Sequence, residues 1–140
     1  MNLPDRLEVN AQGQVAVIDY KTGRPPNFQR IEAGYGVQLG LLAVLLEKEE
    51  PQLHADLFRY WQLSGGAQKP GVESNPLSVR RVEQMDAATF KAKSLENYCE
   101  AVARYILGDE AFLAKVHNIY AQSYSDYDHL ARVSEWLGRR

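Results

Sequence analysis

The sequence is poor in the residues on which several classes of protein depend. Cys99 is the only cysteine among 140 residues, so the chain cannot close an internal disulfide or supply a multi-cysteine zinc or iron–sulfur site. It has no apolar run of the roughly 18 residues that a membrane-spanning helix needs. The first residues, MNLPDRLEVN, lack the basic and apolar regions of a signal peptide. These absences predict a cytoplasmic protein that does not enter a membrane.

The net charge of the chain is also small. It is formally −2, which gives no general attraction to nucleic acid, so any contact with DNA needs a local patch or a basic partner. The length and an apolar fraction of 45% suit one globular domain. A strand pattern begins within a few residues of Met1, with no helix before it. We therefore expect a single domain over residues 1–140 that is a C-terminal fragment of a larger protein.

A β-hairpin is predicted near the start of the chain. Residues 3–9 alternate, and residues 14–21 (QVAVIDYK) form a denser β-rich run of the kind expected for a strand covered on both faces. The loop between them ends in Gly13, which fits a three-residue connection with its last residue in the left-handed region. This loop fixes the register, so Asp5 should face Asp19 across the hairpin.

The stretch VIDYKTG carries two charged residues into a segment that looks buried. Lys21 follows Asp19 by two residues, so both side chains belong on one face of the strand, together with Asp5. Burial of an unpaired charge is costly. The register places these three groups beyond an apolar layer formed by Leu7, Val9, Val15 and Val17.

The remaining elements are predicted from periodicity and from glycine and proline. We expect a mostly buried helix over residues 31–50 and a strand over 53–63, followed by a loop over 67–78. Glycines at positions 34, 36 and 40 either weaken the first helix, by about 1 kcal/mol each, or permit close packing on the sheet. A second helix is predicted over 87–107.

Two features of that second helix follow from its sequence. Asp86 is the expected N-cap, and Gly108 should end the helix. Its apolar stripe begins at Phe90 and includes Cys99, which we therefore expect to be a buried, inert thiol. The other members of the stripe are Leu95, Tyr98, Val102, Tyr105 and Ile106.

Two carboxylates beside an ammonium form a site of hard oxygen ligands. Such a site suits Mg²⁺ or Mn²⁺, and Lys21 could orient an attacking water or stabilise charge on a phosphate. From spacing alone, an exposed ion pair of Asp19 and Lys21 at the strand end is about as plausible. Gln38 either lies at a solvent-exposed helix edge or turns toward the site, and Tyr60 and Trp61 are expected in the core.

The order of these segments resembles a known family. Asp5-Arg-Leu, a hairpin, VIDYKTG and a helix carrying Gln38 resemble the RecB-like branch of the PD-(D/E)xK nuclease superfamily, with Asp19 and Lys21 as its (D/E)xK pair. The stretches IDYKTGRPP, EAGYGVQLGL, FRYWQLSGG and YSDYDHLARVSEW resemble the C-terminal nuclease domain of alphaproteobacterial AddB proteins.

This resemblance implies a fold and an activity. The fold would be an α/β restriction-endonuclease-like core, a mixed central sheet flanked by helices, here without the N-terminal helix. The activity would be Mg²⁺-dependent exonuclease hydrolysis of DNA within a helicase–nuclease that has an AddA-like partner subunit and repairs double-strand breaks. Asp5, Asp19 and the backbone carbonyl of Tyr20 would hold the Mg²⁺ or Mn²⁺ ion, and Lys21 would assist the water. Gln38 and Tyr35 would contact DNA.

The chain also departs from the family pattern. Many relatives have tyrosine four residues after the glutamine, where this chain has Leu42. Some carry four cysteines for an iron–sulfur cluster, which this chain cannot form. Relatives also have an upstream helix with a further residue near the metal. The missing upstream residue and the mild acidity of the chain favour a rival hypothesis, a noncatalytic nuclease-like module that binds DNA or a helicase partner. The presence of Asp5, Asp19 and Lys21 together favours the nuclease.

Overall fold

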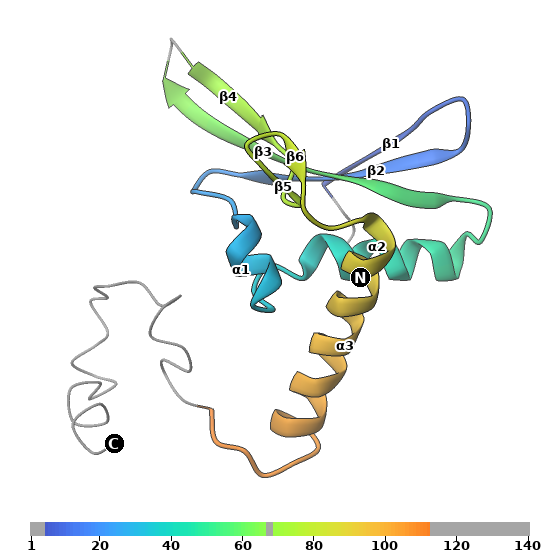
Figure 1. The fold of residues 1–140 in the computed structure, drawn as a ribbon, viewed down its shortest axis with the longest axis vertical. Helices are drawn as coiled ribbons and strands as arrows, with labels where there is room; N and C mark the ends of the chain where they lie inside the picture. Colours follow the sequence, from blue (N-terminus) through green and yellow to red (C-terminus); the bar gives the residue numbers. More distant parts are fainter. Residues whose placement is uncertain (1–4, 67–68, 113–140) are drawn as a thin grey trace. The chain divides into compact units, whose positions relative to one another are not determined.

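The computed structural model describes residues 5–66 and 69–112, and the chain divides into two units, residues 1–101 and 102–140. The first unit is built on a four-stranded sheet (Figure 1) whose strand order is β1-β2-β3-β4. The strands are β1 (Arg6–Val9), β2 (Gln14–Lys21), β3 (His54–Gly66) and β4 (Lys69–Ser74). Only the central pair, β2 and β3, is parallel, so the sheet is mixed. With its flanking helices it is consistent with the expected restriction-endonuclease-like α/β fold.

The predicted hairpin is confirmed in its loop and in its register. Gly13 has a φ of +80°, in the left-handed region that glycine adopts without steric cost. Val9 pairs with Val15 and Leu7 pairs with Val17, as the loop length requires. Asp5 lies one residue before β1, outside the strand ladder.

The predicted helix over 31–50 is two helices, α1 (Phe28–Glu32) and α2 (Gln38–Glu49). Gly34 and Gly36 separate them, with φ values of +86° and +92°. An α-helix cannot continue through residues with positive φ, so these two glycines change the chain direction. The prediction of one continuous helix was therefore wrong at its start.

Gly40 lies inside α2 and has a different role. A Cβ atom at this position would come within 2.1 Å of Oγ and 2.6 Å of Cβ of Ser94, which lies on helix α3 (Ala87–Tyr105). The expectation that glycine permits close packing is therefore right for Gly40, but the packing partner is α3 and not the sheet.

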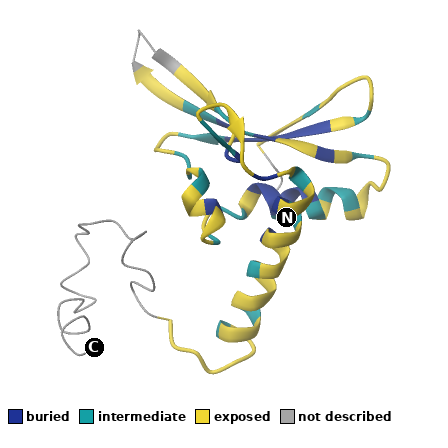
Figure 2. Cartoon of the chain, in the orientation of Figure 1, coloured by how far each residue is buried: buried dark blue, intermediate teal, exposed yellow. Residues whose placement is uncertain are grey.

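The core lies between α2 and one face of the sheet (Figure 2). Phe90 of α3 also belongs to it. Alternate residues of β2 point to this face, and Val15 and Val17 are fully buried there. Leu7 and Val9 of the predicted apolar layer are exposed, because α2 packs chiefly over β2 and β3 rather than over the edge strand β1. The buried members of the core are Val15, Val17, Ile31, Leu39, Leu42, Ala43, Ala55, Phe58, Tyr60, Leu77, Met85 and Phe90.

The opposite face of β2 is also buried, as the dense apolar run predicts. Ile18 is fully buried on this face, and its cross-strand neighbours are Arg6 on β1 and Arg59 on β3. Long arginine side chains flank it on both sides, which is consistent with aliphatic stems covering an apolar residue.

The predicted loop over 67–78 is largely wrong. Its described residues include β4, which pairs with β3, and they end at a two-stranded hairpin of β5 (Ser78–Val79) and β6 (Val82–Glu83). Proline is tolerated in β4 because β4 is an edge strand, where a missing N–H need not break a ladder. The proline and glycine of β4 are typical of loops, so the sequence did not predict this strand.

Helix α3 begins where it was predicted to begin. The carboxylate of Asp86 accepts a hydrogen bond of 2.8 Å from the backbone N–H of Thr89, and this bond lowers the pKa of Asp86. The predicted apolar stripe is mostly wrong, because only Phe90 and Ser94 of this helix are buried and Cys99 is exposed. Among the described residues, no helix has the length and apolar character required to cross a membrane.

Replacement of Gly40 by alanine should test the contact between α2 and α3. We expect Gly40→Ala to lower the free energy of unfolding by about 1–3 kcal/mol through overpacking against Ser94, although alanine favours helix by about 1 kcal/mol. Gly23→Ala is the control, since a Cβ atom there meets nothing within 4 Å. Urea denaturation measures both variants, and a Gly40→Ala variant as stable as the wild type would contradict this packing.

Candidate active site

Asp19 is a buried carboxylate at the end of a core strand. The alternation of β2 that buries Val15 and Val17 places Asp19 on the same face, where it is 4% exposed. Its Oδ2 atom forms an ion pair with Nζ of Lys21 at 2.7 Å. The ion pair of the alternative hypothesis is therefore present, but its carboxylate is buried rather than exposed.

Lys21 connects this carboxylate to helix α2 and to β3. Its Nζ atom donates a 3.2 Å hydrogen bond to Oε1 of Gln38, the first residue of α2, and lies 5.7 Å from the centroid of the Tyr60 ring. The Lys21 side chain is 31% exposed, so the lysine is partly open to solvent. Both alternatives for Gln38 hold in part, because it is exposed at the start of α2 and its amide oxygen also turns toward Lys21.

Asp5 lies beside the same strand end, at the edge of β2 that pairs with β1. Its Oδ2 atom accepts a 2.8 Å hydrogen bond from the backbone N–H of Tyr20. Because the N–H and C=O of one strand residue point to the same edge, the carbonyl of Tyr20 also faces the edge where Asp5 lies. The structure thus brings Asp5 next to the residue that follows Asp19. Whether the two carboxylates share one ion stays a prediction.

Tyr60 was expected in the core, but its place beside the site was not predicted. It is 1% exposed and pairs with Asp19 in the parallel register of β2 and β3. Burial, and then the negative charge of Asp19, raise the pKa of Tyr60 far above its usual value, so the phenol stays neutral. Its position could not be predicted because it depends on the parallel register of β2 and β3, and no short turn between these strands fixes that register.

The donor set fits a hard divalent cation. Among the described residues no cluster of three or more histidine, cysteine or acidic side chains could hold a metal ion. Mg²⁺ is commonly bound in proteins by one or two carboxylates, with water and substrate phosphates completing its shell. The buried carboxylate of Asp19, which already faces one ammonium, is of the type that such an ion binds.

Comparison with known proteins assigns these segments to one family. The family model of the PD-(D/E)XK nuclease superfamily matches residues 3–122. The chain belongs to this superfamily. The match to the nuclease superfamily spans every element that carries a candidate residue, from Asp5 to Gln38. No curated protein and no solved structure shows a significant match. The narrower resemblance to the RecB-like branch and to AddB proteins stays a prediction.

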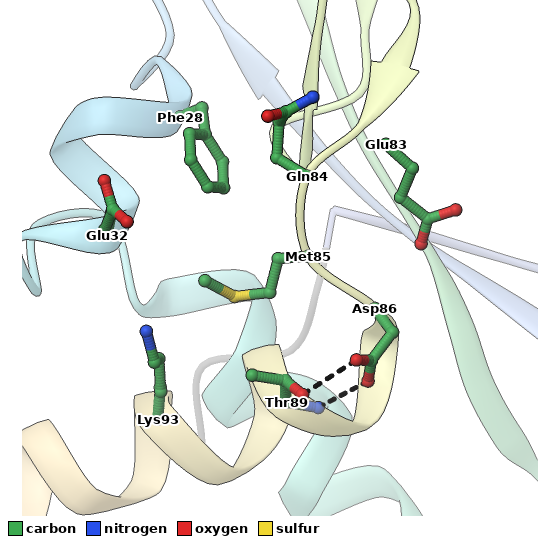
Figure 3. A pocket seen from close by; sticks show the side chains of 8 residues that line it. All are labelled: Phe28, Glu32, Glu83, Gln84, Met85, Asp86, Thr89 and Lys93. Atoms are coloured by element: carbon green, nitrogen blue, oxygen red, sulfur yellow. Dashed lines mark hydrogen bonds between the residues drawn. The ribbon is translucent and has the colours of Figure 1, made fainter.

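A separate pocket of about 600 Å³ lies between α1 and the segment that joins β6 to α3 (Figure 3). Phe28 and Met85 give it apolar walls, and Glu32 and Lys93 bring opposite charges to it. None of the candidate site residues lines it. Its complete lining is Phe28, Glu32, Glu83, Gln84, Met85, Asp86, Thr89 and Lys93.

The unequal burial of the ion pair predicts an unequal response to its removal. Lys21→Met should lower the free energy of unfolding by about 3 kcal/mol in metal-free buffer, because the buried Asp19 loses its cation. Asp19→Asn should change it by less than about 1 kcal/mol, because the amide oxygen can still accept from Lys21 and the lysine reaches solvent. Urea denaturation in EDTA measures both.

The double variant Asp19→Asn/Lys21→Met serves as the control. It removes the stranded carboxylate, so it should recover most of the stability that Lys21→Met alone loses. If Lys21→Met and Asp19→Asn lowered the free energy of unfolding equally, the two partners would be equally buried, which would contradict this account of the pair.

Proposed function

We propose that this protein is a metal-dependent deoxyribonuclease that hydrolyses phosphodiester bonds, with Asp5, Asp19 and Lys21 as its catalytic residues. The observation that carries the proposal is the position of Asp19. A buried carboxylate is costly unless opposite charge compensates it, and here one partly exposed lysine lies beside it at a strand end. In a chain of the nuclease superfamily, this arrangement is best explained by a metal and a phosphate.

The carboxylates of Asp5 and Asp19 and the backbone carbonyl of Tyr20 would hold Mg²⁺ or Mn²⁺. When bound, the ion would supply positive charge to the scissile phosphate as negative charge develops there. Asp5 and Tyr20 support this ligand set because a hydrogen bond already joins them. An exposed carboxylate on one side and a buried one on the other would leave positions open for water and substrate.

Lys21 would act on the water and on the phosphate. Hydrolysis joins a water oxygen to phosphorus, breaks one P–O bond to the sugar, and moves a proton from the water to solvent or to the leaving oxygen. The ammonium of Lys21 can donate a hydrogen bond to the water or to a phosphate oxygen. Gln38 supports this role because it accepts a hydrogen bond from the same nitrogen and limits its movement.

The finer parts of the function are proposed from the sequence resemblance alone. They are exonuclease action, contacts of Gln38 and Tyr35 with DNA, and membership of an AddAB-type helicase–nuclease with an AddA-like subunit in double-strand break repair. The cytoplasm is the proposed location because the DNA substrate lies there in bacteria with such complexes.

The proposal is tested by cleavage of linear duplex and single-stranded DNA with Mg²⁺, with Mn²⁺ and with EDTA. We expect cleavage only with a divalent ion, and a loss of at least about 100-fold for Asp5→Asn, Asp19→Asn and Lys21→Ala. Glu49→Gln is the control, an exposed carboxylate on α2 that should leave the rate unchanged.

Two results would contradict the proposal. A folded chain that cleaves no DNA with either ion would favour the noncatalytic module. Cleavage that survives Asp19→Asn would remove this site from the reaction.

A further inference from the structure

The short hairpin of β5 and β6 combines an unfavourable backbone with an unusual sequence. Val79 pairs with Val82, so Arg80 and Arg81 alone form the loop, and their φ values are +51° and +68°. Two-residue loops with both φ values positive favour Asn-Gly, because a bulky side chain disfavours the left-handed region. Two arginines therefore adopt the left-handed backbone conformation, which is unfavourable for bulky residues.

Both arginine side chains are exposed and have no ionic partner in the described chain. Neither Arg80 nor Arg81 makes a side-chain hydrogen bond or ion pair with the residues that the structure describes. Other arginines differ, since Arg6 pairs with Glu8 and Arg59 pairs with Glu73. The hairpin tip thus presents two adjacent, uncompensated positive charges.

The base of this hairpin is fixed to the core. Leu77 before β5 and Met85 after β6 are both buried, and the backbone N–H of Gln84 donates a 2.9 Å hydrogen bond to the carbonyl of Leu77. The tip is exposed while its two ends are anchored, so the arginines project from a supported turn.

The hairpin base also lies beside α1. Glu83 and Met85 line the same pocket as Phe28 of α1 (Figure 3). Helix α1 follows the segment that leaves the end of β2, where Asp19 and Lys21 lie. The base of the hairpin therefore shares a pocket with the first helix that follows the site strand.

We propose that Arg80 and Arg81 bind phosphates of the DNA backbone and hold the duplex that the Asp19–Lys21 site cleaves. This inference rests on the proposed nuclease function. Guanidinium groups match phosphate oxygens in two-pronged hydrogen bonds, and a chain with a net charge of −2 needs such a local patch to bind DNA. A contact with phosphate would compensate the strain that nothing in the described chain offsets.

The test exchanges the two arginines for the pair that the turn prefers. Arg80→Asn/Arg81→Gly should raise the melting temperature and weaken binding of a fluorescent 20-base-pair duplex in EDTA roughly tenfold. The slope of log K against log salt should fall by about 1.8, since each lost phosphate contact contributes about 0.9. Fluorescence anisotropy over a salt series measures both binding quantities with the full chain.

Two matched variants separate the roles of charge and of turn conformation. Arg80→Lys/Arg81→Lys keeps both charges, so it should keep the salt slope, and it should lose less affinity than the Asn-Gly variant. Lys48→Gln removes an exposed charge in the last turn of α2 and should change the affinity by less than about twofold.

Two binding results would contradict the proposed contact of Arg80 and Arg81 with DNA. Wild-type affinity and salt slope in the Asn-Gly variant would overturn it, and Mg²⁺-dependent cleavage by that variant would leave the nuclease proposal intact. A wild-type chain that binds no duplex would also overturn it. A chain that binds through these arginines but never cleaves would support this inference and remove the nuclease proposal.

Discussion

The ion pair between Asp19 and Lys21 is the interaction on which the candidate site depends. Its carboxylate is buried at the end of a core strand, and its ammonium, 2.7 Å away, belongs to a partly exposed lysine. A buried charge is tolerated only when other charges complete it. Lys21 provides one of them, and the divalent ion that we propose would provide another.

The architecture surrounds that pair from three directions. The parallel register of β2 and β3 sets the neutral ring of Tyr60 opposite Asp19. The two positive-φ glycines between α1 and α2 end the first helix, so that α2 starts at Gln38 and directs an amide oxygen to Lys21. Asp5 reaches the strand end from the hairpin. Tyr60 and Gln38 belong to elements that pack in the core, β3 and α2, whereas Asp5 is held by its hydrogen bond to Tyr20.

Local patterns predicted the parts of this arrangement that local physics determines. The loop ending in Gly13 fixed the hairpin register, and strand alternation placed Asp19 and Lys21 on one face. The break before Gln38, the strand β4 and the exposure of Cys99 were not predicted, because they depend on backbone direction and on tertiary pairing. The place of Tyr60 beside the site has the same origin, since a parallel pair is joined by a long connection rather than a turn.

The central claim is that Asp5, Asp19 and the carbonyl of Tyr20 bind one divalent ion. Anomalous diffraction from a crystal of the chain grown with Mn²⁺ tests it most directly, because it locates the ion without relying on activity. We expect one anomalous peak at coordination distance, about 2.0–2.2 Å, from a carboxylate oxygen of both aspartates. A Mn²⁺ ion bound elsewhere, or a crystal with Mn²⁺ absent from this strand end at saturating concentration, would contradict it.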